Sequence, residues 1–201
     1  MPFNRRRFIA SAAALGVPAS AIRAQAPRTP TPAMTEGPFY PQTFTSEPQA
    51  RLVQGSLLGN ATLLALEGRV LDRFGQPVEA ARVEIWQCDA LGHYTHPRDS
   101  TAAERDPNFA GLGWTRSDAK GNYAFETIRP VPYPGRTPHI HFALKAPKFR
   151  RLVTQMFVDG IAQNQSDGIY GSMTQAQRQL VTARLEASGQ GQRARFDLVL
   201  G

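Results

Sequence analysis

The chain has 201 residues, of which 41% are hydrophobic and 19% charged, with one cysteine and a formal net charge of +7. This length suits one well-buried domain, and the composition excludes an intrinsically disordered chain and a collagen. The single Cys88 can form neither an internal disulfide nor a thiolate zinc cluster, so a bound metal must rely on histidine, carboxylate or phenolate ligands.

The first 26 residues have the three-part layout of an export signal. Arginines at positions 5–7 precede an apolar run over residues 9–22, and residues 24–26 supply a small-x-small cleavage site. The arginine pair resembles a twin-arginine signal, so we expect the twin-arginine export machinery as a partner and a periplasmic or secreted protein. The alternative is a basic N-terminus without defined structure. The run contains Gly16 and Pro18 and is too short and broken for a membrane anchor.

This leader accounts for much of the positive charge. It holds four arginines and no acidic residue, so the remaining chain has 19 basic and 16 acidic residues and a net charge of +3. A modest surplus suits anionic small molecules. We therefore expect no nucleic-acid partner.

Beyond the leader the sequence predicts an all-β fold. Six prolines between residues 27 and 50 deny this stretch a helix or a central strand, which predicts an extended arm over residues 27–60. Residues 174–187 carry apolar side chains every three to four positions and predict one short helix in the C-terminal half, ended by Gly189. The rest predicts a single-domain β-sandwich over residues 61–201, with strands near residues 63–71, 81–87, 123–128, 139–146, 152–158 and 194–200.

The four histidines fall into two pairs. His139 and His141 alternate along an expected strand, which places both imidazoles on one face in a geometry suited to one metal ion. Alone this pattern is weak, since two polar residues on a solvent-exposed face would look the same. His93 and His96 flank Tyr94 in a turn, and we expect them to be exposed loop histidines.

Several motifs occur together and in a characteristic order. They are Gly92-His93-Tyr94, Asp106-Pro107-Asn108-Phe109, Pro132-Tyr133-Pro134 and Pro138-His139-Ile140-His141-Phe142. This order resembles the intradiol ring-cleavage dioxygenases, above all the protocatechuate 3,4-dioxygenase branch, and the resemblance runs from about Thr35 to the C-terminal segment. Such enzymes open a catecholic ring between its two hydroxyls with O2 and give a cis,cis-muconate-type diacid.

The resemblance implies a role for seven residues. Tyr94 and Tyr133 would be phenolate ligands of a non-haem Fe(III), and His139 and His141 its imidazole ligands, with Tyr133 also acting as the base that accepts a substrate proton. Arg136 would stabilise negative charge on the substrate ring. Gln155 would help to position the substrate, and Tyr40, in Gly37-Pro38-Phe39-Tyr40, would lie near the mouth of the pocket.

The sequence also departs from the family pattern. The loop from Tyr133 to His139 is short, and Gly135 stands where protocatechuate enzymes carry a bulky aromatic residue, so we expect a wider pocket. The helical N-terminal region of catechol 1,2-dioxygenases is missing. Other readings are a non-catalytic sandwich module, carbohydrate-binding or transthyretin-like, and a metal-dependent hydrolase, which would need a third histidine or a carboxylate. The identity of the catechol and the oligomeric state, a homo-oligomer included, stay open.

Overall fold

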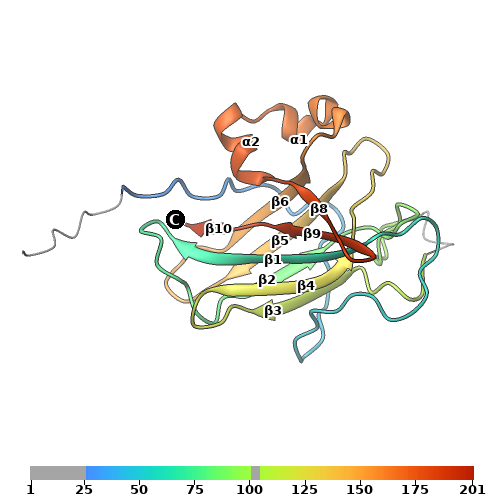
Figure 1. Cartoon of the computed structure of the whole chain (residues 1–201), viewed down its shortest axis with the longest axis horizontal. Helices are drawn as coiled ribbons and strands as arrows, with labels where there is room; N and C mark the ends of the chain where they lie inside the picture. Colours follow the sequence, from blue (N-terminus) through green and yellow to red (C-terminus); the bar gives the residue numbers. More distant parts are fainter. Residues whose placement is uncertain (1–25, 101–104) are drawn as a thin grey trace, which may run out of the picture.

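The computed structural model describes residues 26–100 and 105–201, so all but the final residue of the expected export signal lies outside the described residues. Two five-stranded sheets face each other, and the helices lie together on one side (Figure 1). The first sheet runs β10 (Leu198–Leu200), β1 (Leu63–Asp72), β9 (Gly191–Arg195) and β8 (Leu185–Ser188), with β4 (Asn122–Ile128) also paired to β1. The second runs β3 (Leu112–Arg116), β2 (Arg82–Trp86), β5 (His139–Lys145), β6 (Leu152–Val158) and β7 (Thr182–Ala183). The predicted all-β sandwich is confirmed.

The main hydrophobic core fills the space between the sheets. Strand β1 alternates buried and exposed residues, with Leu64 and Leu66 turned inward, as expected of a strand with one solvated face. Strands β5 and β6 differ, because nearly all of their residues are buried on both faces. Ile140 belongs to the core between the sheets, so His139 and His141 lie on the outer face of β5.

The N-terminal arm helps to cover that outer face. It contains no helix and no strand of its own within residues 27–60, as predicted. Its backbone is bound at several points: Thr31 N–H donates to Val199 O over 3.0 Å, and Met34 N–H donates to Val153 O over 2.8 Å. In Figure 1 the blue arm passes beside β10, in agreement with the first of these bonds. A segment rich in proline thereby brings side chains onto the second sheet without joining it as a full strand.

The predicted helix over residues 174–187 is wrong beyond its first half. Helix α2 spans Gln175–Val181 and begins with a capping box between Thr174 and Gln177. It ends because Thr182 is extended and pairs with Phe157 of β6, so tertiary pairing overrides the helical spacing. The following residues form β8, and Gly189, with φ of 57°, lies in the turn to β9 and ends no helix.

Two other predictions need correction. The expected strand over residues 194–200 is two strands, β9 and β10, separated by Phe196 and Asp197, and β3 was not predicted. Two further short helical elements follow β6: the 3-10 helix η2 (Ala162–Ser166) and α1 (Gly168–Gly171). Both lie next to the second sheet at the end where His139 begins β5.

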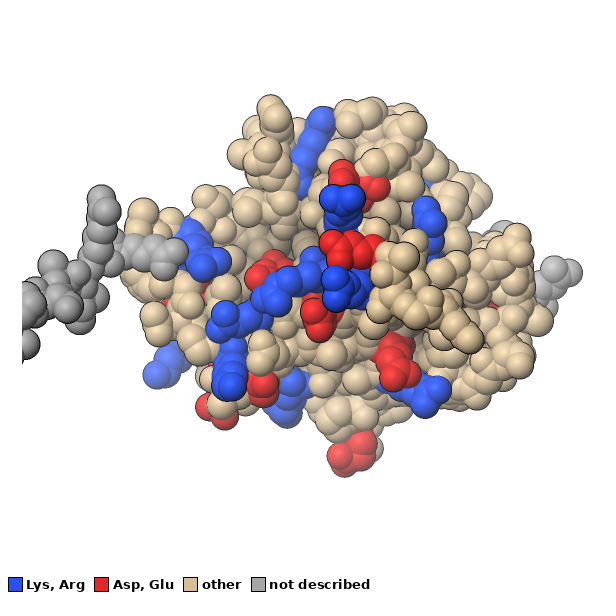
Figure 2. Space-filling view, in the orientation of Figure 1, with Lys and Arg blue, Asp and Glu red and all other residues tan. Residues whose placement is uncertain are grey.

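Charges are interspersed on the face of the molecule shown in Figure 2, where basic side chains lie beside acidic ones. Three exposed ion pairs join such residues on the molecular surface: Arg51–Glu126, Arg193–Glu186 and Arg195–Asp197. Within the described ranges, no helix has the length and apolarity needed to cross a membrane.

The arm packs closely against Gly113 of β3. A larger side chain at this position should therefore destabilise the fold. A Cβ added there would overlap the carbonyl oxygen of Gln49 and lie 2.9 Å from Leu52 Cδ1. We expect Gly113→Ala to lower the free energy of unfolding by about 1–3 kcal/mol, measured by urea denaturation. Gly168→Ala is the control, because nothing lies within 4 Å of its added Cβ. Equal stability of the two variants would contradict this close packing.

Candidate active site

A pair of buried imidazoles forms the centre of the site. His139 and His141 are each 1% exposed, and their Nε2 atoms are 3.1 Å apart. His139 Nδ1 lies 2.6 Å from the carbonyl oxygen of Thr137, which can only accept, so the ring proton is on Nδ1 and Nε2 carries a lone pair. Two nitrogens this close need a proton or a cation between them. The reading of these residues as solvent-facing polar side chains is therefore wrong.

Two tyrosines from separate loops approach the same point. Tyr94 is 2% exposed, and its backbone N–H donates to Asp99 Oδ2 over 2.6 Å. Its hydroxyl is buried and has no hydrogen-bond partner among the described residues. The ring centroid of Tyr133 lies 5.4 Å from that of Tyr94 and 5.5 Å from that of His139, and Tyr94 and His141 are 6.2 Å apart. The structure thus brings all four predicted ligands together.

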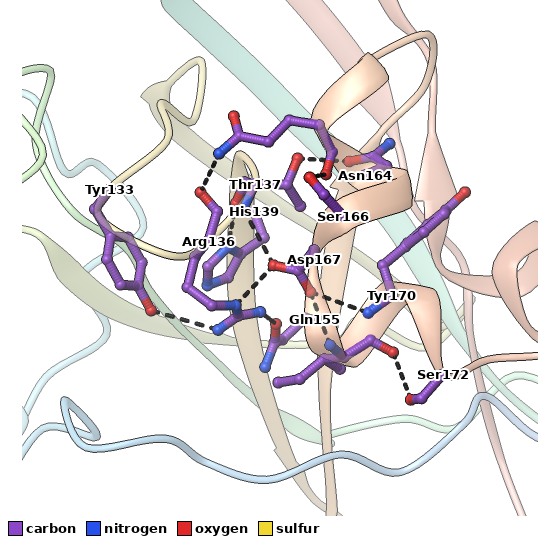
Figure 3. Close-up of polar contacts among 12 residues, drawn as sticks. Tyr133, Arg136, Thr137, His139, Gln155, Asn164, Ser166, Asp167, Tyr170 and Ser172 are labelled. Carbon is purple, nitrogen blue, oxygen red and sulfur yellow. Dashed lines mark hydrogen bonds and ion pairs between the residues drawn. The ribbon is translucent and has the colours of Figure 1, made fainter.

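Arg136 and Gln155 join this group, as Figure 3 shows. Arg136 Nη1 donates to the Tyr133 hydroxyl over 3.4 Å, and Nη2 donates to Gln155 Oε1 over 2.6 Å. Gln155 pairs directly with His141 across β5 and β6, which explains its place beside the histidines. The Nε2 atom of Gln155 is buried without a partner among the described residues. It is available as a donor to a molecule bound there.

Tyr40 lies one layer further out. Its hydroxyl donates to Glu84 over 2.9 Å, and its ring meets Trp86 edge-on with centroids 5.0 Å apart. Trp86 in turn stacks on His141 at 4.7 Å. Trp86 therefore lies between Tyr40 and His141.

The sequence did not single out three residues that shape the site. Phe39 stacks on Tyr94 at a centroid distance of 4.5 Å, Trp86 stacks on His141, and Asp167 binds Arg136. Alternation along β2 does place Trp86 on the face opposite to the core residues, and an Asp before a short helix is a capping signal. Neither pattern shows which residue the side chain contacts.

The expectation that His93 and His96 are both exposed is wrong. His96 is only 6% exposed, its Nδ1 accepts the backbone N–H of Arg98 over 3.0 Å, and its ring meets Phe39 edge-on. It is buried because the turn after β2 folds under the arm. His93 is half-buried.

A cavity of about 350 Å³ opens beside the two tyrosines and has Phe39, Tyr94, Tyr133, Pro134 and Arg98 among its lining residues. Its wall is largely aromatic and proline, which suits a flat aromatic molecule. Gly135 has φ of 81°, and a Cβ added to it would have no atom within 4 Å. Gly135, for which the sequence predicted a wider pocket, therefore adjoins open space.

The donor set fits one hard, highly charged metal ion. Burial raises the pKa of Tyr94 well above its usual value, so only a strong Lewis acid would ionise it at neutral pH. Burial also lowers the pKa of His139 to about 4, which keeps its imidazole neutral and able to coordinate. Among the described residues no three His, Cys, Asp or Glu side chains converge.

Comparison with known proteins gives a consistent result. The family described as "Dioxygenase" matches residues 35–201. The chain is 40% identical to the protocatechuate 3,4-dioxygenase beta chain of Burkholderia cepacia over 68% of this chain and 63% of that protein. It is 33% identical to the hydroxyquinol 1,2-dioxygenase of Corynebacterium glutamicum over 84% of this chain and 60% of that protein. The chain thus spans less than two thirds of the length of these relatives.

A solved structure of similar size matches along almost its whole length. The dioxygenase domain of a dioxygenase and carbohydrate-binding protein fusion from Streptomyces sp. SirexAA-E has a TM-score of 0.68 and 29% identity, over 86% of this chain and 98% of that one. Catechol 1,2-dioxygenase from Acinetobacter sp. ADP1 has a TM-score of 0.67 and 26% identity, over 85% and 62%. This chain belongs to the intradiol ring-cleavage dioxygenases.

Proposed function

We propose that this protein is a non-haem Fe(III) dioxygenase that cleaves a catecholic ring between its two hydroxyls with O2, giving a cis,cis-muconate-type diacid. One observation carries the proposal: two buried imidazole nitrogens lie 3.1 Å apart, faced by a buried tyrosine hydroxyl without a partner among the described residues. Membership of the dioxygenase family supports it. The relatives' printed names include protocatechuate, hydroxyquinol and catechol, all of which carry adjacent ring hydroxyls.

In this proposal Tyr94, Tyr133, His139 and His141 hold the iron. Anionic phenolates favour a trivalent ion, and neutral imidazoles complete the set. When bound, Fe(III) acts as a Lewis acid that ionises the two phenols and activates a chelated catecholate. The two tyrosines differ in their exposure to solvent: Tyr133 is half-buried, whereas Tyr94 is buried. Tyr133 would therefore be the phenolate that a substrate hydroxyl can reach and that would accept its proton.

Arg136 provides a fixed positive charge beside the substrate. Its guanidinium is already hydrogen-bonded to the Tyr133 hydroxyl, so it adjoins the place where the ring gains negative charge. Gln155 holds one guanidinium nitrogen and keeps its own amide N–H group free of partners among the described residues. Phe39 and Pro134 line the cavity beside the two tyrosines.

Colour and oxygen uptake test the proposal directly. Purified protein loaded with iron should be burgundy, with a broad visible charge-transfer band that shifts when catechol is added. Over a panel of catechols it should consume one O2 per ring opened, followed with an oxygen electrode and product mass spectrometry. Tyr94→Phe or Tyr133→Phe should weaken or shift the band, because each removes one phenolate ligand.

Tyr170→Phe is the matched control, since this buried tyrosine packs against Phe157 away from the cluster. It should keep the band of the unaltered protein. A protein that stays colourless and inactive after loading with iron would sink the dioxygenase proposal. An unchanged band in Tyr94→Phe would refute that ligand alone.

We also propose that the protein is exported in folded form by the twin-arginine route, on the strength of the arginine pair and the apolar run that follows it. Replacing both Arg5 and Arg6 by Lys should retain the protein in the cytoplasm at full length. Cell fractionation and intact mass measure this, and Arg7→Lys serves as the control. Equal export of the double variant would rule the route out.

The buried histidines predict how acid affects the protein without metal. Burial lowers the pKa of His139 to about 4 and that of His141 well below its usual value, so the unfolded chain binds protons that the folded chain does not. The contribution of His139 to stability is complete above pH of about 6.5 and is lost as the pH falls toward 4, at about 3 kcal/mol.

Urea denaturation of the full chain across this pH range measures the loss. His139→Asn should reduce the pH dependence, because it removes one of the two buried imidazoles, while that of His141 remains. His93→Asn controls for the substitution itself. A pH dependence that His139→Asn leaves intact would contradict the assignment to this histidine.

A further inference from the structure

Asp167 is a buried carboxylate beside the site. Its side chain is 0% exposed, and all of its acceptor positions are occupied. Oδ1 accepts the backbone N–H groups of Ile169 and Tyr170, each over 3.0 Å. Oδ2 accepts Arg136 Nε over 2.8 Å and the backbone N–H of Thr137 over 3.1 Å. Figure 3 shows the carboxylate between α1 and the loop that carries Arg136.

The two oxygens therefore have separate tasks. Oδ1 caps α1, which any short polar side chain can do, and the next helix is capped in the same way by the uncharged Thr174. Oδ2 faces the site and holds a guanidinium. Capping alone thus requires no negative charge at this position, and the charge is used on the side of Arg136.

Arg136 has its direction set at three points. Its Nε binds Asp167, Nη2 binds Gln155 Oε1, and Nη1 is left to point at the Tyr133 hydroxyl. A guanidinium is planar, so fixing Nε and Nη2 determines where Nη1 lies. Of these three partners, only Asp167 carries a full charge at neutral pH in the absence of metal, and the Arg136 side chain is only 17% exposed.

The Asp167 carboxylate also helps to fix the backbone segment that leads to His139. Thr137, whose N–H it accepts, bonds through Oγ1 to Asn164 Oδ1 over 2.7 Å, and its carbonyl accepts His139 Nδ1–H over 2.6 Å. The residues from Arg136 to His139 are therefore anchored by η2 and α1 together.

We propose that Asp167 is a positioning residue for the ring-cleavage reaction: it orients and charge-balances Arg136, so that Nη1 is held beside the Tyr133 oxygen, next to the place where the substrate ring gains negative charge. The inference rests on the proposed function and adds to it a residue 31 positions away in sequence. Asp167 touches neither Tyr133 nor the proposed substrate cavity among the contacts described, and acts through Arg136.

Asp167→Asn tests this role, because the amide oxygen can still cap α1 while the charge is lost. We expect kcat of the iron-loaded full chain to fall about 10- to 100-fold, with KM changed less than about threefold, since a misplaced group in the transition state costs rate rather than binding. Thr174→Ala removes the cap of α2 without touching the site, and should lower stability with kcat unchanged.

A double-mutant cycle distinguishes positioning from general damage. Arg136→Gln should lower kcat, and adding Asp167→Asn to it should lower kcat by less than about twofold more, because the residue through which Asp167 acts is already gone. If Asp167→Asn lowers kcat equally in both backgrounds, the proposal is overturned. If Asp167→Asn and Asp167→Ser both fail to fold, Asp167 is required by the fold itself and the positioning role is overturned.

One further readout does not depend on activity. In the full chain prepared without metal, the Arg136 Nε–H should exchange slowly with solvent by NMR. It should exchange at least about tenfold faster in Asp167→Asn, because the amide oxygen caps α1 and the NH2 group that then faces Nε–H cannot accept its hydrogen bond. Unchanged exchange would refute the orienting contact. If the unaltered protein cleaves no catechol while this exchange result holds, the proposed function fails and the contact between Asp167 and Arg136 stands.

Discussion

The close approach of two imidazole nitrogens inside the protein is the constraint on which the rest of the structure depends. His139 and His141 share a face of β5 because strand residues two apart always do, and burial keeps both rings neutral. Nitrogens 3.1 Å apart are stable only with a positive charge or a proton between them. Covering that face of β5 from solvent is accordingly the task shared by the arm, the turn after β2, and the segment containing η2 and α1.

Each covering segment brings a different kind of side chain. The arm brings Phe39, the turn after β2 brings the unpartnered hydroxyl of Tyr94, and the loop before β5 brings Tyr133 and Arg136. The carboxylate of Asp167 arrives last in sequence and balances the only guanidinium bonded to the tyrosine pair among the described residues. The sandwich provides rigidity, and the chemistry comes from connections between its strands, as is usual for functional loops on a stable scaffold.

The sequence predicts the elements that depend on local patterns, and it does not predict those that depend on tertiary contacts. The bounds of β6 were predicted to the residue, because a short run rich in apolar and β-branched residues is typical of a strand. The predicted helix was extended too far, since no local pattern shows that Thr182 pairs with β6. The four proposed ligands followed from motif order. Asp167 and Phe39 did not, because their partners lie 31 and 55 positions away along the chain.

The bond between the arm and β10 has a consequence for how the site is assembled. Val199 N–H donates to Thr31 Oγ1 over 2.9 Å, a contact between residues 168 positions apart. The arm that positions Phe39 against Tyr94 is thus secured by a strand that the ribosome produces long after the arm itself. The aromatic contact between Phe39 and Tyr94 therefore gains this support only once synthesis has passed Val199.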